Sequence, residues 1–213
     1  MLLHLVKKDF LLIKNFLPLL VILPFAIPIF LMIQASQLLG FSAFVLSVIF
    51  TVFMLYQYVL MAEMKYPKAE SLLCATPYSR STLVKARYAF LILIFTYCGL
   101  AYNILALIFI KIDHLTPSSY LITMLISVIL FGIYTPVQYK LGFEKTKYFF
   151  MILIMVSPFL MAILAKNNIK LDFTALSALP MFIQYLIPIV SIIAILFISI
   201  NVSTKIYLKK ELL

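Results

Sequence analysis

Long apolar runs separated by short charged segments make up most of the chain. No Asp, Glu, Lys or Arg occurs between Lys14 and Glu63. One crossing of the hydrocarbon core of a membrane takes about 20 residues, so this uncharged stretch is long enough to cross twice. The polar segment Gln34–Gln37, which is closed by Gly40, divides it. We therefore predict two consecutive membrane-spanning helices in this stretch.

The same reasoning predicts six transmembrane helices in the whole chain. Their expected ranges, bounded by charged or polar residues, are about 16–33, 38–62, 88–110, 118–139, 148–165 and 179–204. Strands are not expected, because the runs show no alternation and open sheet edges cannot lie in lipid. The predicted fold class is an all-α polytopic membrane protein that forms a single transmembrane domain over residues 1–213.

The basic residues orient these spans. Lys and Arg are enriched in short cytoplasmic loops of membrane proteins. The N-terminus, the loops after the second and fourth spans, and the C-terminal tail hold 14 of the 17 basic residues, and the alternate loops hold only Lys111, Lys166 and Lys170. This bias predicts a multi-pass protein of a plasma membrane with both termini in the cytoplasm.

The first 15 residues form a separate basic segment. On a helix, Leu3, Val6, Phe10, Ile13 and Leu17 share one apolar stripe, while most of the basic side chains lie elsewhere. A basic amphipathic helix can lie in the membrane interface and contact lipid, which is our expectation for residues 1–15. Alternatively, the segment simply extends the first span into the cytoplasm.

Composition agrees with a membrane protein. Hydrophobic residues make up 65% of the chain and charged residues 11%, whereas soluble domains have about 25% charged residues. The net charge of +10 would suggest nucleic-acid binding in a soluble protein, but here membrane topology explains it and no nucleic-acid partner is expected. Cys74 and Cys98 do not have zinc-site spacing, and we expect no metal site.

The second loop, Glu63–Arg87, is long for a simple connector. Residues 69–75 could form a short helix with an apolar patch, ending near Pro77. Ser79 or Ser81 could cap the helix that continues into the third span. A short cytoplasmic helix of this kind can enter a partner's groove. Alternatively, a basic loop of this kind can anchor helix ends to anionic lipid.

This loop carries a family resemblance. The segment ESLLCATPYSRSTLVKARY, residues 70–88, resembles the cytoplasmic loop of small six-span bacterial type-2 ABC exporter permeases, with matches at Pro77, Ser79, Arg80, Lys85 and Tyr88. The segment PVQYKLGFEK, residues 136–145, and the start KKDF, residues 7–10, are also similar to the family pattern. Thr76 departs from the leucine expected before the proline.

The resemblance implies partners and site residues. It implies a permease that pairs with a second permease copy and with cytoplasmic P-loop ATPase subunits, which hold the ATP and magnesium. It assigns ATPase docking to a coupling helix around residues 72–80, with a second contact at 144–145, and the residues are Glu70, Leu72, Leu73, Pro77, Tyr78, Arg80, Glu144 and Lys145. The chain itself contains no GxxxxGK[ST] motif, so we expect it to be no enzyme and to carry no cofactor.

Polar residues within the spans are candidates for a substrate path, because they are costly in lipid. They include Tyr56, Gln57, Asn103 and Gln184. Alternatively, they form hydrogen bonds between packed helices. Pro24, Pro28, Pro136, Pro158 and Pro188 could be hinges or tolerated kinks. An uncharged interior rich in Phe and Met suits a hydrophobic or amphipathic cargo, and the resemblance favours a peptide.

Three functions other than export make different demands on the sequence. An intramembrane enzyme, or a carrier coupled to protons or sodium, would need acidic or His residues within the spans, and the predicted spans contain none. A non-transporting immunity or assembly protein that binds peptide or lipid remains open on the sequence alone. It differs from an exporter in predicting no ATPase contact at residues 72–80.

Overall fold

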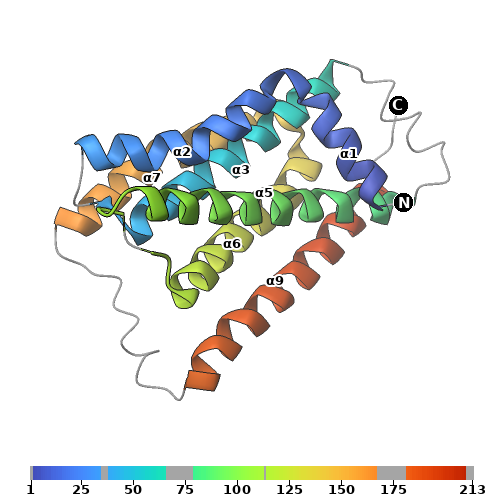
Figure 1. Ribbon diagram of the computed structural model, residues 1–213. Coiled ribbons are helices and arrows are strands. Elements are labelled where there is room, and N and C mark those ends of the chain that lie inside the picture. The colour runs from blue at the N-terminus through green and yellow to red at the C-terminus, as the bar shows by residue number, and fades with distance from the viewer. Residues whose placement is uncertain (1, 35–37, 66–78, 113, 167–180, 210–213) are drawn as a thin grey trace.

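The described part of the computed structural model is helical and contains no strand. It comprises residues 2–34, 38–65, 79–112, 114–166 and 181–209. The helices are α1 (Leu2–Leu12), α2 (Leu17–Gln34), α3 (Phe41–Met64), α5 (Arg80–Ile108), α6 (Pro117–Leu141), α7 (Phe143–Lys166) and α9 (Met181–Lys209), and a 3₁₀ turn, η1 (Lys14–Phe16), joins α1 to α2. Figure 1 shows them as one bundle.

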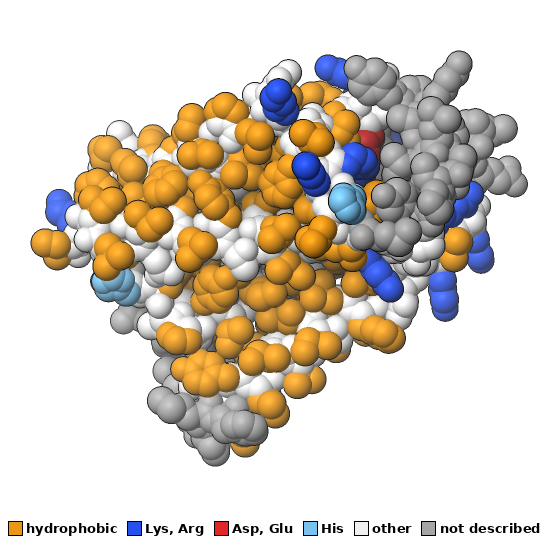
Figure 2. Space-filling view, turned by 45° about the vertical axis from the view of Figure 1, so that its right-hand side comes forward, with side chains coloured by type: hydrophobic (Ala, Val, Ile, Leu, Met, Phe, Trp, Pro, Cys, Tyr) orange, Lys and Arg blue, Asp and Glu red, His pale blue; other side chains and the backbone are white. Residues whose placement is uncertain are grey.

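Five helices are long and apolar enough to cross a membrane. They span Lys14–Gln34, Phe41–Met64, Arg80–Ile108, Pro117–Leu141 and Ile183–Lys209 within the described residues. They match the first four predicted spans and the last one. The remaining predicted span falls within α7, a 24-residue helix, and its crossing stays a prediction. The space-filling view shows a face covered mostly by hydrophobic side chains (Figure 2), as expected where lipid replaces water.

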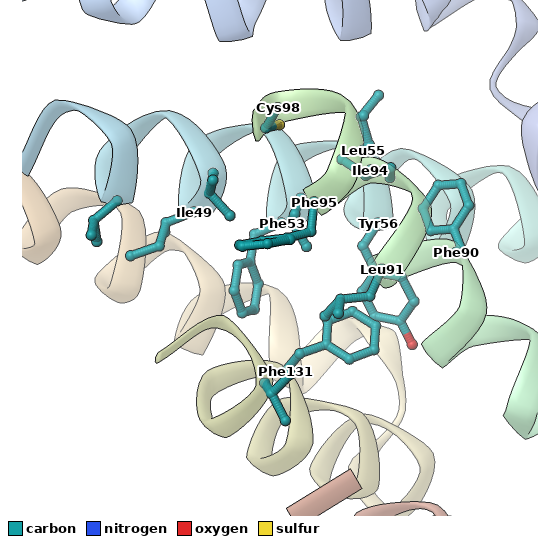
Figure 3. Close-up of a cluster of buried hydrophobic side chains, with 14 of the residues drawn as sticks. Ile49, Phe53, Leu55, Tyr56, Phe90, Leu91, Ile94, Phe95, Cys98 and Phe131 are labelled. Carbon is teal, nitrogen blue, oxygen red and sulfur yellow. The ribbon is translucent and has the colours of Figure 1, made fainter. Parts of the chain in front are cut away.

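α3 lies at the centre of the bundle. It is apolar on all sides, and such a helix is stable only when it is surrounded by other apolar groups. Its neighbours are α1, α2, α5, α6 and α7. Figure 3 shows side chains of α3, α5 and α6 filling one core, with Phe53 facing Phe131 at a ring-centre distance of 6.2 Å. By contrast, few side chains of α2 and α9 are fully buried.

The contacts fix the direction of the helices. Tyr102 of α5 donates a hydrogen bond to the Gly40 carbonyl (3.0 Å) at the start of α3, so these helices are antiparallel. α6 and α9 run parallel, since Ser199 contacts Gly132 and the rings of Tyr139 and Tyr207 lie 5.0 Å apart. We call the end where α3, α6 and α9 finish the basic end. Of the described Lys and Arg side chains outside α7, only Lys111 lies toward the opposite end.

Serine hydroxyls satisfy three carbonyls that proline leaves without a partner. Proline has no N–H, so the carbonyl four residues earlier loses its helical donor. The three carbonyls, freed by Pro28, Pro136 and Pro158, are those of Pro24, Gly132 and Ile154. They accept hydrogen bonds from Ser47 (3.4 Å), Ser199 (2.6 Å) and Ser157 (3.2 Å). The prolines are thus accommodated inside continuous helices, and their role as hinges stays a prediction.

Several helices extend beyond the ranges predicted for the spans. α5 begins at Arg80, whereas the predicted span began at 88 after Arg87. Arg87 lies inside this helix, and two carboxylates pair with its charge. Ser79 caps α5 instead, since its side chain accepts a hydrogen bond from the Thr82 N–H (3.3 Å), which confirms the cap predicted at Ser79 or Ser81. α9 likewise continues to Lys209.

Candidate functional site at the basic end

Most of the predicted docking residues lie outside the described structure. The proposed coupling helix at 69–75 and its residues Glu70, Leu72, Leu73, Pro77 and Tyr78 all fall between 66 and 78. What the structure does describe is the two stems of this loop. The incoming stem is the end of α3, and the outgoing stem is the start of α5. Both stems carry charged side chains that contact other helices.

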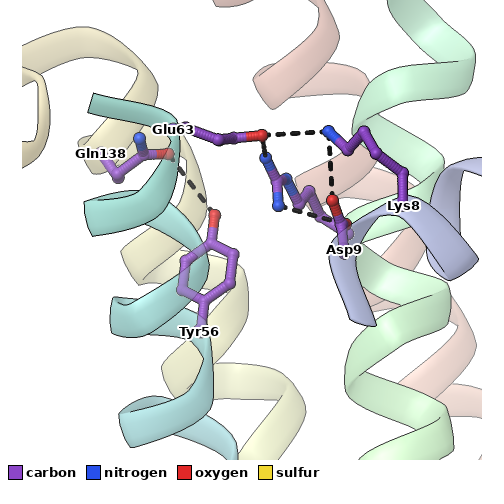
Figure 4. A network of polar contacts seen from close by, with 6 residues as sticks. Lys8, Asp9, Tyr56, Glu63 and Gln138 are labelled. Carbon is purple, nitrogen blue, oxygen red and sulfur yellow. Dashed lines mark hydrogen bonds and ion pairs between the residues drawn. The ribbon is translucent and has the colours of Figure 1, made fainter. Parts of the chain in front are cut away.

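Four charged side chains form a closed ring around these stems (Figure 4). Lys8 Nζ lies 3.1 Å from Asp9 Oδ1 and 3.0 Å from Glu63 Oε1. Arg87 Nη1 lies 3.1 Å from Asp9 Oδ2, and Arg87 Nη2 donates a hydrogen bond to Glu63 Oε1. Anions and cations therefore alternate around the ring, and its two positive and two negative charges cancel. We call these four residues the charge ring.

The charge ring joins three helices at a buried point. Asp9 is 1% exposed and Arg87 7% exposed, while Glu63 lies closer to the surface. Isolated charges would be expensive at such a site, whereas a paired, neutral group is tolerated. Glu63 belongs to the incoming stem and Arg87 to the outgoing stem, and both contact α1 through Lys8 and Asp9. The ring thus fixes α1 to both stems of the loop.

Aromatic and amide side chains extend the charge ring toward α6. The Arg87 guanidinium carbon lies 5.9 Å from the centre of the Tyr56 ring, within range of a cation–π interaction. The Tyr56 hydroxyl donates to Gln138 Oε1 (3.4 Å), as Figure 4 shows. The neighbouring Gln57 donates to the Tyr134 hydroxyl (2.5 Å). Two of the predicted substrate-path residues therefore bond α3 to α6, as the alternative interpretation expected.

Arg80 forms a second clamp at the outgoing stem. Its Nη1 donates to the carbonyls of Leu208 (3.1 Å) and Tyr207 (3.4 Å) in the last turn of α9. The final carbonyls of a helix lack helical donors and carry partial negative charge, so a guanidinium is a favourable partner. We call this contact the Arg80 clamp. The residue predicted to dock an ATPase thus also holds α5 to α9.

A buried hydroxyl cluster reinforces the contact between α5 and α9. The Tyr88 hydroxyl lies 2.6 Å from Ser199 Oγ and 3.0 Å from Ser203 Oγ. Ser199 also donates to the Gly132 carbonyl of α6, so three helices meet at one polar point. A Cβ added at Gly132 would lie 3.4 Å from Ser199 Oγ, so α6 and α9 are in van der Waals contact at this point.

The other predicted site residues do not join these groups. Glu144 and Lys145 are exposed in the first turn of α7, with a docking role that stays a prediction. Asn103 is exposed near the end of α5 and donates to its own helix at Gly99 O (3.0 Å). Gln184 is half-buried in the first turn of α9, also toward the opposite end from Tyr56. The structure does not bring the four predicted path residues together.

The sequence did not predict the charge ring, because its basic members, Lys8 and Arg87, also fit the charge bias that predicts topology. Lys8 and Arg87 do follow the orientation pattern, yet both are paired. A usable signal was the rarity of carboxylates, since the chain has only seven Asp and Glu residues. Asp9 and Glu63, beside the first and second predicted spans, are two of them. Carboxylates so close to apolar runs are expected to have cationic partners.

Comparison with protein families identifies the chain. The model of the ABC-2 family transporter protein family matches residues 4–208, nearly the entire sequence. The chain belongs to this family. The match confirms the resemblance drawn from the loop and start segments. No curated protein and no solved structure was found to match the chain. As an ABC-2 protein, the chain is a multi-pass membrane protein of the permease type.

Proposed function

We propose that this ABC-2 protein is the permease subunit of an ATP-driven exporter. Its cargo is hydrophobic or amphipathic, with peptide as the preferred class, and it leaves the cytoplasm through the membrane domain. The observation that carries the proposal is the family match over residues 4–208, together with five helices suited to crossing a membrane. The apolar, Phe- and Met-rich composition supports the choice of cargo.

The proposed topology has six spans, with α7 as the fifth. The basic end then faces the cytoplasm of a bacterial cell, because Lys and Arg favour that side of the plasma membrane. Both termini lie on this side. The loop at 66–78 and the turn between α6 and α7 then also face the cytoplasm, where a soluble partner can reach them.

The proposed partner is a P-loop ATPase that binds ATP and magnesium, and a second permease copy completes the complex. The ATPase docks on the loop through the five residues between 70 and 78 and through Arg80. Glu144 and Lys145 provide a second contact. In support, both are exposed at the basic end, which is also where α5 begins at Arg80.

The charge ring and the Arg80 clamp connect the loop mechanically to the rest of the bundle. In our proposal, ATP binding moves the docked loop, and the two stems move with it. The ring then carries this motion to α1, and the clamp carries it to α9. A buried polar network has one favourable geometry, so its helices move together rather than sliding independently. The result is a shift between two arrangements of the bundle.

Transport by inside-out membrane vesicles tests the function. Vesicles from cells that express the chain and its ATPase are supplied with ATP and a peptide extract of the same cells, and the trapped peptides are identified by mass spectrometry. We expect ATP-dependent accumulation of apolar or amphipathic peptides that is absent without the chain. Equal accumulation with and without the chain, when both proteins are present at normal levels, would contradict peptide export. An ATP-independent retention of peptide would instead support the immunity function.

A further inference from the structure

α1 has two opposite faces with different surroundings. Leu5, Val6 and Asp9 are buried against the bundle, and Ile13, just after the helix, is fully buried. Phe10 belongs to this side as well, since its ring centre lies 5.1 Å from that of Phe90 in α5. The predicted apolar stripe is therefore correct for three of its members, but Leu3 is not part of the buried face.

The outer face of α1 alternates leucine and basic residues. Leu3 is 76% exposed and Leu11 60% exposed, and Lys7 lies between them on the same face, also exposed. His4 is exposed beside them, and exposed Lys14 follows the helix in η1. At 100° per residue, Leu3, Lys7 and Leu11 fall within one arc of about 80° on α1, and Lys14 follows them in η1. We call these four residues the outer arc.

The outer arc is positively charged, and no acidic side chain of α1 pairs with its lysines. The only carboxylate of α1 is Asp9, which is buried in the charge ring on the opposite side. Among the described residues, no ion pair is formed by Lys7 or Lys14. An anionic partner is therefore complementary to this surface, and two exposed leucines require it to be apolar next to its charge.

The outer arc is continuous with the surface that faces lipid. η1 joins α1 directly to α2, whose outward side chains include Val21 (51% exposed) and Ile22 (59% exposed). In Figure 2, the Lys and Arg side chains in view gather mostly toward one end, beside a broad hydrophobic surface. A lipid leaflet has acyl chains beneath a layer of phosphates, which matches the arrangement of hydrophobic side chains beside the Lys and Arg side chains. Lysine can bury its methylene stem beside leucine and still reach a phosphate.

We propose that the outer arc of α1 binds the headgroups of anionic phospholipids in the leaflet at the basic end. Lys7 and Lys14 contact lipid phosphate, and Leu3 and Leu11 insert among the upper acyl chains. The charge ring then holds the lipid-bound helix to both stems of the loop at 66–78. The site rests on the membrane placement of the chain alone, and it holds whether or not the protein exports a peptide.

Backbone hydrogen exchange of the full chain in lipid nanodiscs tests the proposal. The discs contain either phosphatidylcholine alone or a mixture with phosphatidylglycerol that has the same acyl chains. We expect amide exchange in α1 to slow when phosphatidylglycerol is present. Each lysine near an anionic surface contributes enough attraction for a change of about fivefold. In the Lys7→Gln and Lys14→Gln variants, the slowing of α1 exchange by phosphatidylglycerol should each time be smaller by about that factor. In the double variant, exchange of α1 should be the same in both lipids.

Matched controls separate this site from general attraction to a basic surface. Lys209→Gln removes an exposed cation from the end of α9 and should leave the lipid dependence of α1 unchanged. Native-like exchange of each variant in phosphatidylcholine shows that α1 is still folded; if Lys7→Gln unfolds it, Lys14→Gln decides. Inorganic phosphate added to phosphatidylcholine discs should not reproduce the protection. Equal exchange of native α1 in the two lipids, or equal loss in Lys209→Gln, would overturn the proposal. Protection of α1 that arises only on adding the ATPase, in either lipid, would overturn it too.

Discussion

Arg87 carries a charge that is unfavourable to bury, and its ion pairs offset that cost. It is almost fully buried, yet it contacts Asp9 and Glu63 and lies over the ring of Tyr56. Replacing one member of a buried ion pair leaves its partner charged without compensation, which costs more than the intact pair contributes. The free energy therefore depends on keeping the charge ring balanced rather than on any single contact.

Removing Arg87 should be partly rescued by removing Asp9. Arg87→Gln leaves two carboxylates with only Lys8, and we expect the free energy of unfolding to fall by about 3–5 kcal/mol. Asp9→Asn combined with Arg87→Gln restores neutrality, and this double variant should be more stable than Arg87→Gln alone. Thermal unfolding of the purified chain in detergent measures both. Lys85→Gln, an exposed change on the same helix, is the control, and a double variant less stable than Arg87→Gln would refute a balanced ring.

We expect Ser199 to stabilise the protein, because Pro136 leaves the Gly132 carbonyl without its helical donor. Ser199→Ala removes the donor to the Gly132 carbonyl, and we expect a loss of about 0.6–1.7 kcal/mol, the range of hydrogen bonds between membrane helices. Pro136→Ala restores the N–H that serves this carbonyl, so Ser199→Ala should cost less in that background. The measurement is a double-mutant cycle by thermal unfolding. Equal costs in both backgrounds would show that the serine does not act through the freed carbonyl.

At the scale of elements, the sequence predicted the helices that long hydrophobic runs form. The uncharged stretch up to Glu63 contains α2 and α3, as expected, because lipid requires long helices with internally paired backbones. The start of α5 was predicted correctly from the cap at Ser79 or Ser81. The pairing of Arg87 was not predicted, because Arg87 looks like a solvated span boundary when its partners on α1 and α3 are unknown. Pairing between distant segments is a tertiary property, and the local pattern around Arg87 does not contain it.

The Arg80 clamp joins the loop to α9, and reversing its charge should break transmission. Arg80→Glu would place a carboxylate beside the terminal carbonyls of α9, which is unfavourable at a helix C-terminus. We expect export to fall by at least about tenfold, the effect of losing about 1.4 kcal/mol of coupling, while the protein level in the membrane stays normal. The measurement is ATP-dependent export in vesicles, with Lys85→Glu on the same helix as control.

Export that persists in Arg80→Glu at normal expression would exclude the clamp from coupling and would also argue against ATPase docking at Arg80. A variant with normal ATPase binding but no export would separate the two roles, because docking would be intact and only transmission lost.

At the scale of the whole molecule, the pattern of charges predicted the arrangement of helices better than it predicted the site. Alternate loops rich and poor in Lys agree with a bundle in which α3, α6 and α9 end on one side. The site could not be inferred as fully. Tyr56 and Gln57 were predicted to line a substrate path because polar groups are rare in spans. Both form hydrogen bonds to α6, and their place in a path stays a prediction. Composition identifies such residues but does not determine which neighbour they face.

Cysteine labelling tests the six-span topology. In a background of Cys74→Ser and Cys98→Ser, single cysteines replace Lys111, Lys147 or Lys205. A membrane-impermeant maleimide should label position 111 in intact cells, and it should label positions 147 and 205 only after the cells are opened. Position 147 lies in the second turn of α7, and the rest of that helix separates it from position 170. If α7 crosses the membrane, a cysteine at Lys170 should behave like one at Lys111. Labelling of position 170 only in opened cells would remove the span proposed for α7.

The most direct test of the central claim is purification of the tagged chain from its native membranes in mild detergent, followed by mass spectrometry of partners present in equal amounts. We predict a P-loop ATPase that is retained by the native chain and lost when Leu72, Leu73 and Arg80 are changed together. Recovery of the chain without any ATPase, under conditions that preserve a known exporter complex, would contradict the permease function and favour a non-transporting membrane protein that binds peptide.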